Sequence, residues 1–200
     1  MTQQKKQRII IGISGASGIV YSLCFLEKLR QLSIETHLVI SSSAERTLAY
    51  ETNKKLKDII KMADFYYRHD DIGAAISSGS FLTMGMIIAP CSVRSMSEIA
   101  TGVTSNLLTR AADVCLKERR KLVLLVRETP LHSGHLRTML TLSDMGAIIA
   151  PPVPAFYAKP KNLDDMVEHT VGRVGDLFDL EFGFIRRWGE EKSLKKRSDN

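Results

Sequence analysis

The sequence predicts a three-layer α/β fold, in which a doubly wound parallel sheet lies between two layers of helices. Short apolar runs of strand length alternate with segments of helical period along the chain. The runs at 9–11, 86–89 and 122–126 are continuously apolar, as expected of parallel strands that helices cover on both faces. The composition, with 44% hydrophobic and 25% charged residues in a chain of 200, is typical of a globular protein.

We expect about five parallel strands, each an apolar run bounded by small, polar or charged residues. In chain order they are Arg8–Ser14, Glu35–Ser41, Met84–Cys91, Leu122–Arg127 and Ala147–Ala150. Elsewhere apolar residues recur every three or four positions, which predicts helices packed on the sheet. These helices are expected at Val20–Leu32, Ala44–Glu51, Leu56–Ala63, Val93–Ala100, Asn106–Glu118, Gly134–Met145 and Leu163–Phe182.

No repeat, low-complexity stretch or change in composition marks a linker, so residues 9–189 are expected to form one domain. Residues 1–8 are expected to be a flexible basic N-terminus and residues 190–200 a flexible charged tail. The net charge of +6 comes from residues 1–8 and 192–200, which leaves residues 9–191 neutral. Because a nucleic-acid backbone binds cations gathered on one face, this distribution disfavours a nucleic-acid partner.

The cysteine pattern and the N-terminal sequence favour a cytoplasmic protein. Cys24, Cys91 and Cys115 are odd in number and lack Cys-x-x-Cys spacing, which favours reduced thiols and no zinc site. Only residues 9–13 form an apolar run after the basic N-terminus, too few for the apolar region of a signal peptide. No run of about 18 apolar residues is present that would predict a membrane span.

Small and hydroxyl-bearing residues follow three of the predicted strands. The first exit, Gly12–Gly18, has G-x-x-G-x-x-G spacing, which differs from the dinucleotide-binding fingerprint. Ser41–Ser43 follows the second strand and Pro90–Ser95 contains the third exit. Parallel sheets bind ligands at these C-terminal ends, where helix N-termini offer free N–H groups. N-capping explains each exit alone, but three together favour a phosphate-bearing ligand.

Charged and aromatic residues follow the last two strands. Arg127 and Glu128 leave the fourth strand, where an ion pair with each other or with a neighbour is an equally good interpretation. The proline-rich segment 151–157 ends in two aromatic residues and can either form the floor of a pocket or simply pack. His132 and His135 have a spacing that metal ligands can have, but no cysteine or matched carboxylate pair accompanies them, so no metal site is predicted.

Nine segments between Ile9 and Trp188 resemble the flavin prenyltransferases of the UbiX/Pad type. They are GISGASG at 12–18, ETHLVIS at 35–41, SSGSF at 77–81, PCS at 90–92, LTRAADV at 108–114, LKERR at 116–120, RETPL at 127–131, PPVPAFY at 151–157 and RW at 187–188. The resemblance implies a flavodoxin-like, Rossmann-like flavoprotein. It also implies that a dimethylallyl group is joined from dimethylallyl monophosphate to N5 and C6 of reduced FMN, without a metal.

The same resemblance implies partners. The product, prenylated FMN, would serve a separate UbiD-type decarboxylase, and the pathway, quinone synthesis or phenolic-acid degradation, stays open. The family usually assembles as a dodecamer built from trimers, with active sites at subunit junctions, so a homo-oligomer is expected.

The resemblance further implies roles for individual residues. The flavin would be held by Gly15, Ala16, Ser17, Ser41, Ser92, Val93, Arg94, Ser95 and Arg110. Dimethylallyl phosphate would be bound by Lys117, Arg127, Glu128, Tyr157, Arg173 and Trp188. Ser17 and Glu51 would relay a proton near flavin N5 and C6, while Glu128 would orient the cations or protonate the departing phosphate. Without magnesium, the arginine and lysine side chains would have to offset the charge of that phosphate.

Two positions depart from the family pattern, and two other functions are alternatives to it. Ser42 stands where relatives often carry Lys, and Arg94 where small or Lys side chains occur, so the contacts to the flavin phosphate are open. One alternative is a flavin-dependent cysteine decarboxylase, but its P-x-M-N-x-x-M-W segment is missing and Glu51 stands where its histidine is expected. The other is a non-catalytic flavin-binding module, which would not need the phosphate-binding cations.

Overall fold

A parallel sheet of six strands, in the order β3-β2-β1-β4-β5-β6, forms the centre of the computed structural model, which describes residues 7–183. The strands are β1 (Arg8–Ile13), β2 (Glu35–Ile40), β3 (Phe65–Arg68), β4 (Gly85–Cys91), β5 (Lys121–Val126) and β6 (Ile148–Ile149). All five pairings are parallel, which confirms the predicted doubly wound α/β class. The strand order reverses between β1 and β4, the place where such sheets bind ligands.

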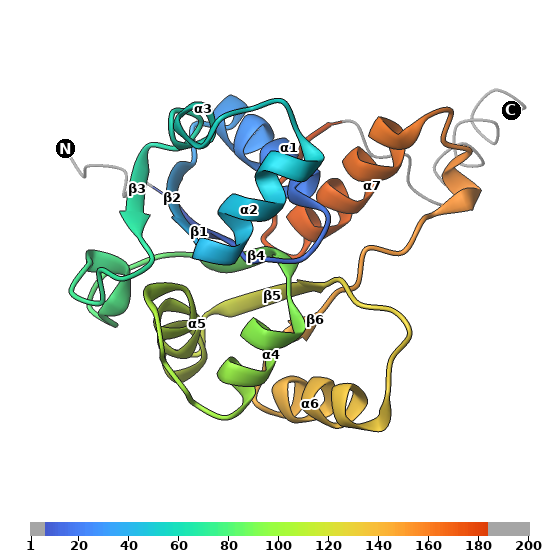
Figure 1. Cartoon of the computed structure of the whole chain (residues 1–200). Helices are drawn as coiled ribbons and strands as arrows, with labels where there is room; N and C mark the ends of the chain where they lie inside the picture. The colour runs from blue at the N-terminus through green and yellow to red at the C-terminus, as the bar shows by residue number, and fades with distance from the viewer. Residues whose placement is uncertain (1–6, 184–200) are drawn as a thin grey trace, which may run out of the picture. The chain divides into compact units, whose positions relative to one another are not determined.

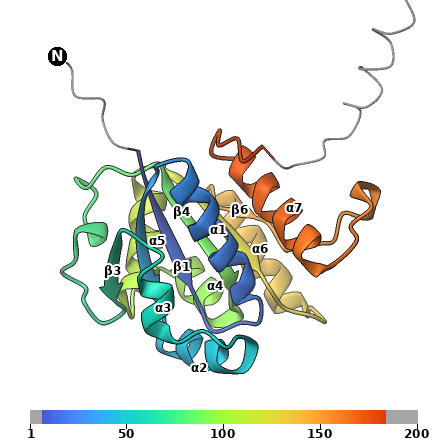
Figure 2. The same ribbon diagram turned by 90° about the horizontal axis from the view of Figure 1, so that it is seen from above.

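Helices cover both faces of this sheet (Figure 1). They are α1 (Ile19–Gln31), α2 (Ser42–Glu51), α3 (Leu56–Ile60), α4 (Val93–Ala100), α5 (Leu107–Lys117) and α6 (Ser133–Asp144), with the short 3-10 helix η1 (Ala75–Ser77). Further along the chain follow the short 3-10 helix η2 (Phe156–Ala158) and helix α7 (Leu163–Asp176). Helices α4, α5 and α6 lie together on one side, and α1 lies along β1 and β4 on the other (Figures 1 and 2). Within residues 7–183, no helix has the length and apolar character needed to cross a membrane.

The continuous apolar runs of the strands are explained by burial on both faces. Ile10, Met86 and Leu124 belong to a core cluster with residues of α4, α5 and α6. Neighbouring positions such as Ile9 and Ile87 point to the opposite face and are also fully buried. Burying one such aliphatic side chain contributes roughly 1.5–3 kcal/mol, so these residues stabilise the packing of the helices on the sheet.

Strand β3 is a sixth strand that the sequence pattern does not predict. It has only four residues, pairs with β2 alone, and its first and last residues, Phe65 and Arg68, are exposed. An exposed edge strand of this kind carries no continuous apolar run. Helix α7 also ends at Asp176, earlier than the predicted Phe182, and Asp179 then adopts a left-handed φ of 59° that stops helical geometry.

The chain divides into two compact units, residues 1–152 and 153–200. The first contains the sheet, and the described part of the second contains η2 and α7. The expectation of one domain over residues 9–189 stays a prediction. Of the ends expected to be flexible, Arg8 begins β1, while residues 1–6 and 190–200 lie outside the described part of the chain.

A buried polar cluster connects β1, β2 and β3. His37 is 2% exposed, with Nε2 3.0 Å from the Glu35 carboxylate and Nδ1 3.0 Å from the Tyr67 hydroxyl. Arg8 donates to the same Glu35 oxygen at 2.7 Å, and its guanidinium lies 4.8 Å from the centre of the Phe81 ring. Burial lowers the pKa of His37, although the hydrogen bond from His37 to the Glu35 carboxylate opposes that effect. The folded chain therefore favours a neutral His37.

We expect the free energy of unfolding to fall as the pH is lowered from about 7.5 to about 5.5. The unfolded chain takes up a proton on His37 at a higher pH than the folded chain does. The stabilisation is therefore present above the ordinary pKa of histidine and is lost as the pH falls through it toward the folded value. Urea denaturation across this range should give a flatter pH dependence for H37Q than for the unmodified chain. Equal slopes would contradict this account of His37.

Candidate active site

Main-chain hydrogen bonds align the C-terminal ends of neighbouring strands. The N–H of Ser41, after β2, donates to the carbonyl of Ile13 at the end of β1 at 2.9 Å. The N–H of Arg127, after β5, donates to the carbonyl of Cys91 at the end of β4 at 3.0 Å. The serine-rich and charged exits predicted from the sequence therefore share one edge of the sheet.

Ser14 joins the β1 and β4 exits at the point where the strand order reverses. Its side chain is fully buried, and its hydroxyl donates to the carbonyl of Pro90 at 2.8 Å. The same oxygen accepts from the N–H of Ser92 at 2.7 Å. Because the hydroxyl proton and a lone pair are both engaged, Ser14 is placed to hold the two exits together rather than to react.

Serine side chains cap the helices that begin at this edge. The Ser41 hydroxyl accepts from the N–H of Ala44 at 3.2 Å at the start of α2, and the Ser92 hydroxyl accepts from the N–H of Ser95 at 3.3 Å at the start of α4. A capped start keeps other first-turn N–H groups and the positive end of the helix dipole directed at the edge. Both properties fit a phosphate group such as that of FMN.

The loop from β1 to α1 passes too close to α2 for a side chain at Gly15. A Cβ atom added there would lie 2.3 Å from the hydroxyl oxygen of Ser43 and 2.5 Å from its Cβ. Gly18, the N-cap of α1, has a φ of 112°, which favours glycine. Ser17 lies between these two glycines and is exposed, so its hydroxyl is accessible at this edge.

Glu51 reaches the same loop from the last residue of α2. Its carboxylate accepts from the N–H groups of Gly18 at 2.9 Å and Ile19 at 3.0 Å. Helix α1 has no cap from its own Gly18, so Glu51 places a negative charge at that N-terminus. The predicted pair, Ser17 and Glu51, therefore meets around one loop. The capping contact itself was not predicted, since no local pattern reveals a partner 33 residues away.

Arg127 and Glu128 follow β5 at this edge, and both are exposed. Glu128 accepts from the N–H of Thr129 at 3.0 Å. The charge of Arg127 acts on Tyr21 of α1, where burial raises the pKa of the hydroxyl and Arg127 partly offsets the rise. One cation and one carboxylate of the predicted phosphate-binding set thus lie at the strand exits.

Arg94 and Arg110 lie near the N-terminal ends of α4 and α5. Each pairs with a carboxylate on its own helix: Arg94 with Glu98 at 2.8 Å and Arg110 with Asp113 at 2.6 Å. The Arg94 side chain is 81% exposed. These pairings leave both guanidinium groups near helix starts but partly neutralised.

Lys117 lies at the opposite edge of the sheet from Arg127. It is the last residue of α5 and pairs with Glu118, and β5 begins only at Lys121. Arg127 follows the other end of β5, and a strand of this length spans about 20 Å. One copy of the chain does not bring these two cations together.

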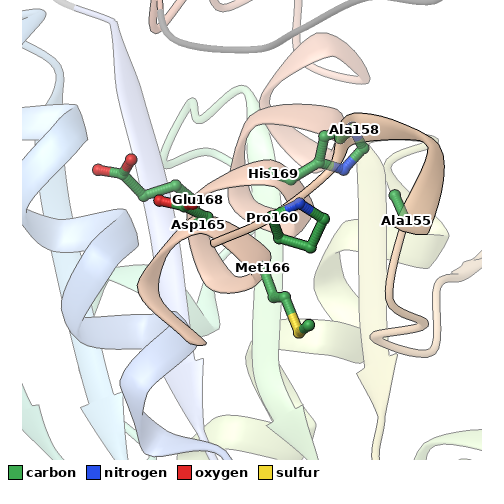
Figure 3. A pocket seen from close by; sticks show the side chains of 7 residues that line it. All are labelled: Ala155, Ala158, Pro160, Asp165, Met166, Glu168 and His169. Atoms are coloured by element: carbon green, nitrogen blue, oxygen red, sulfur yellow. The ribbon is translucent and has the colours of Figure 1, made fainter. Parts of the chain in front are cut away.

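Tyr157 and Arg173 belong to the second unit. The Tyr157 hydroxyl lies 3.2 Å from Nε2 of His169, and Arg173 donates to Asp176 on the same helix. A cavity of about 140 Å³ in this unit is lined by Ala155, Ala158, Pro160, Asp165, Met166, Glu168 and His169 (Figure 3). Trp188, expected to bind dimethylallyl phosphate, lies outside the described residues.

Neither the histidines nor the buried cysteines form a metal or thiolate site in the described part of the chain. Across residues 7–183, no three His, Cys, Asp or Glu side chains are grouped as metal ligands. Nδ1 of His132 instead accepts from the N–H groups of Gly134 and His135, which caps α6. Burial raises the pKa of the Cys91 and Cys115 thiols to about 12, which disfavours a reactive thiolate.

Comparisons with known proteins agree with this fold. The family model described as Flavoprotein matches residues 1–175, which defines the class as flavoprotein. The flavin prenyltransferase UbiX of Thauera aromatica is 51% identical over 191 residues, with 94% of this chain and 98% of that protein covered. The chain belongs to the flavin prenyltransferase family.

Two solved structures show the same fold. A crystal structure of AnUbiX (PadA1) in complex with FMN and dimethylallyl pyrophosphate has a TM-score of 0.91 at 45% identity, covering 92% of this chain and 98% of that one. A dodecameric FMN-dependent Ubix-like decarboxylase from Escherichia coli O157:H7 has a TM-score of 0.89 at 47% identity, covering 91% and 99%. The flavodoxin-like expectation is thereby confirmed.

We expect G15A to weaken FMN binding about tenfold, because the added methyl group would force the loop and the start of α2 apart at a cost of about 1–3 kcal/mol. G73A is the matched control, since Gly73 is exposed and a Cβ there would meet only the Asp71 side chain at 3.7 Å. FMN titration followed by flavin fluorescence measures both. If G15A and G73A bind FMN equally well, the loop does not hold the flavin.

Proposed function

We propose that this chain transfers a dimethylallyl group from dimethylallyl monophosphate to reduced FMN and releases prenylated FMN. The observation that carries the proposal is the single edge of the sheet where capped helix starts, Ser17, Glu51, Arg127 and Glu128 occur together in a chain of this family. Reduced FMN, when bound, supplies N5 and C6 as the atoms that accept the group.

The flavin is assigned to the helix starts and the glycine loop. At Gly15 and Ala16 the main chain can approach the flavin closely, and Ser17 provides an exposed hydroxyl. The FMN phosphate is assigned to the starts of α2 and α4. There it would be held by Ser41 and by the segment Ser92, Val93, Arg94 and Ser95, with Arg110 as a further cation. The helix dipoles add to these hydrogen bonds because both point their positive ends at the same edge.

The dimethylallyl phosphate is assigned to Arg127, Arg173 and Lys117, with the Tyr157 hydroxyl as a neutral donor. As the phosphate leaves, its negative charge grows, and each charge-assisted hydrogen bond to it can contribute about 1.5–3 kcal/mol. One carboxylate oxygen of Glu128 accepts from the N–H of Thr129 in the same loop. In this proposal Glu128 orients these cations or protonates the departing phosphate.

Proton transfer is assigned to Ser17 and Glu51. Glu51 stays close to the Ser17 loop because its carboxylate is fixed on the N–H groups of Gly18 and Ile19. Carboxylate lone pairs beyond those two contacts are available for a proton. A proton removed from flavin C6 could therefore pass by way of Ser17 to Glu51.

A second copy of the chain completes the phosphate site in this proposal. Lys117 and Arg127 lie at opposite edges of one sheet, so only another copy can bring a Lys117 to Arg127. The dodecameric state of the Escherichia coli relative supports a homo-oligomer, and we propose a dodecamer here too. In this proposal the enzyme works in the cytoplasm, and its product, prenylated FMN, passes to a UbiD-type decarboxylase.

Mass spectrometry of the flavin tests the reaction directly. After anaerobic incubation with reduced FMN and dimethylallyl monophosphate, the extracted flavin should gain one C5 unit. Incubation without the dimethylallyl substrate is the control. Flavin that copurifies but stays unchanged in mass would contradict the transferase function and leave a flavin-binding role.

Mixed oligomers test whether two copies build one phosphate site. K117A and R127A should each be nearly inactive alone, because each removes one cation from every site. Random mixing on co-expression should restore about a quarter of the sites, those that pair an intact Arg127 with an intact Lys117 from another copy. Co-expression of K117A with the double variant K117A/R127A should restore none. No recovery in the first mixture would place both cations in one chain.

A further inference from the structure

Tyr157 and His169 form a defined pair inside the second unit. The Tyr157 hydroxyl lies 3.2 Å from Nε2 of His169, and the two rings meet edge to face, with centroids 5.5 Å apart and planes at 84°. This combination of a hydrogen bond and a ring contact restricts both side chains. In Figure 3 the His169 ring lies beside Ala158 of η2, the short helix that also contains Tyr157.

His169 lies one helical turn before Arg173 on α7. Side chains four residues apart share one face of a helix, so the residue that contacts Tyr157 and the cation assigned to the phosphate come from one side of α7. The positive charge of Arg173 adds to burial in lowering the pKa of His169. The folded chain therefore favours the neutral ring, which carries its proton on one nitrogen only.

The chemistry of the phosphate decides the direction of the Tyr157–His169 hydrogen bond. A phosphate dianion only accepts hydrogen bonds, and a tyrosine hydroxyl has a single proton to donate. If His169 accepted that proton, Tyr157 could not donate it to the phosphate. Donation from Nε2–H of His169 to the phenolic oxygen avoids this competition and fixes the hydroxyl at the same time.

We propose that His169 is a positioning residue that donates from Nε2 to the Tyr157 oxygen and so leaves the phenolic proton for the phosphate of the dimethylallyl substrate. This inference rests on the proposed function. Nδ1 then carries the lone pair of the neutral ring. His169 is half-buried and lines the cavity of about 140 Å³, so its replacement introduces no clash in a packed core.

Two substitutions separate the hydrogen bond from the bulk of the side chain. H169L removes the donor and should raise the KM for dimethylallyl monophosphate about tenfold, with kcat changed less than about twofold. H169Q retains an N–H donor and should restore a KM within about twofold of the unmodified chain. Calorimetric titration of the FMN-loaded variants with dimethylallyl monophosphate should show the same order of affinities. FMN affinity and the melting temperature should stay the same in both.

A double-mutant cycle with Y157F decides whether the effect passes through Tyr157. In the Y157F background, H169L should raise the KM no further, because the hydroxyl it positions is gone. The positioning role would be overturned if H169L raised the KM equally in both backgrounds. It would also be overturned if H169Q failed to restore the affinity for dimethylallyl monophosphate, or if FMN binding were lost in parallel. Unmodified KM in H169L, with the C5 unit still transferred, would overturn this role alone. No transfer by the unmodified chain would overturn the proposed function and this role with it.

Discussion

The two hydrogen bonds of the buried Ser14 hydroxyl are the contact on which the arrangement of the site depends. They join the end of β1 to the end of β4, the strands between which the sheet reverses its order. The loop that follows β1 contains Ser17 and receives Glu51, while the segment after β4 starts α4 with Ser92 as its cap. Since a buried hydroxyl left without partners costs about 1–3 kcal/mol, this junction has one favourable geometry. The positions of both helix starts follow from it.

The apolar sheet determines where the other polar groups can lie. Strand β5 is buried from Leu122 to Val126, so the cations before and after it are confined to opposite edges. This is why Lys117 and Arg127 cannot serve the same ligand within one chain, and why the proposed phosphate site requires a second copy. Within the second unit, His169 links Tyr157 to the helix that carries Arg173.

Sequence reasoning predicts best the features that depend on neighbouring residues. The apolar runs identify five of the six strands, and serine at the exits identifies the capped starts of α2 and α4. It fails where the partner is distant or the segment is exposed. Strand β3 is a short edge strand, Glu51 caps a helix 33 residues earlier in the chain, and His169 has no motif of its own. Lys117 is separated from Arg127 because α5 ends at the edge of the sheet where β5 begins, while Arg127 follows the other end of β5. A list of site residues inferred from family resemblance does not show this separation.

The most direct test of the account is a cryo-electron microscopy structure of the oligomer with FMN and dimethylallyl monophosphate. The account predicts the FMN phosphate within hydrogen-bond distance of the starts of α2 and α4. It also predicts Arg127 of one copy and Lys117 of another on the dimethylallyl phosphate. FMN bound at the opposite edge of the sheet, where Lys117 lies, would contradict it, as would a dimethylallyl phosphate held by Lys117 and Arg127 of the same copy.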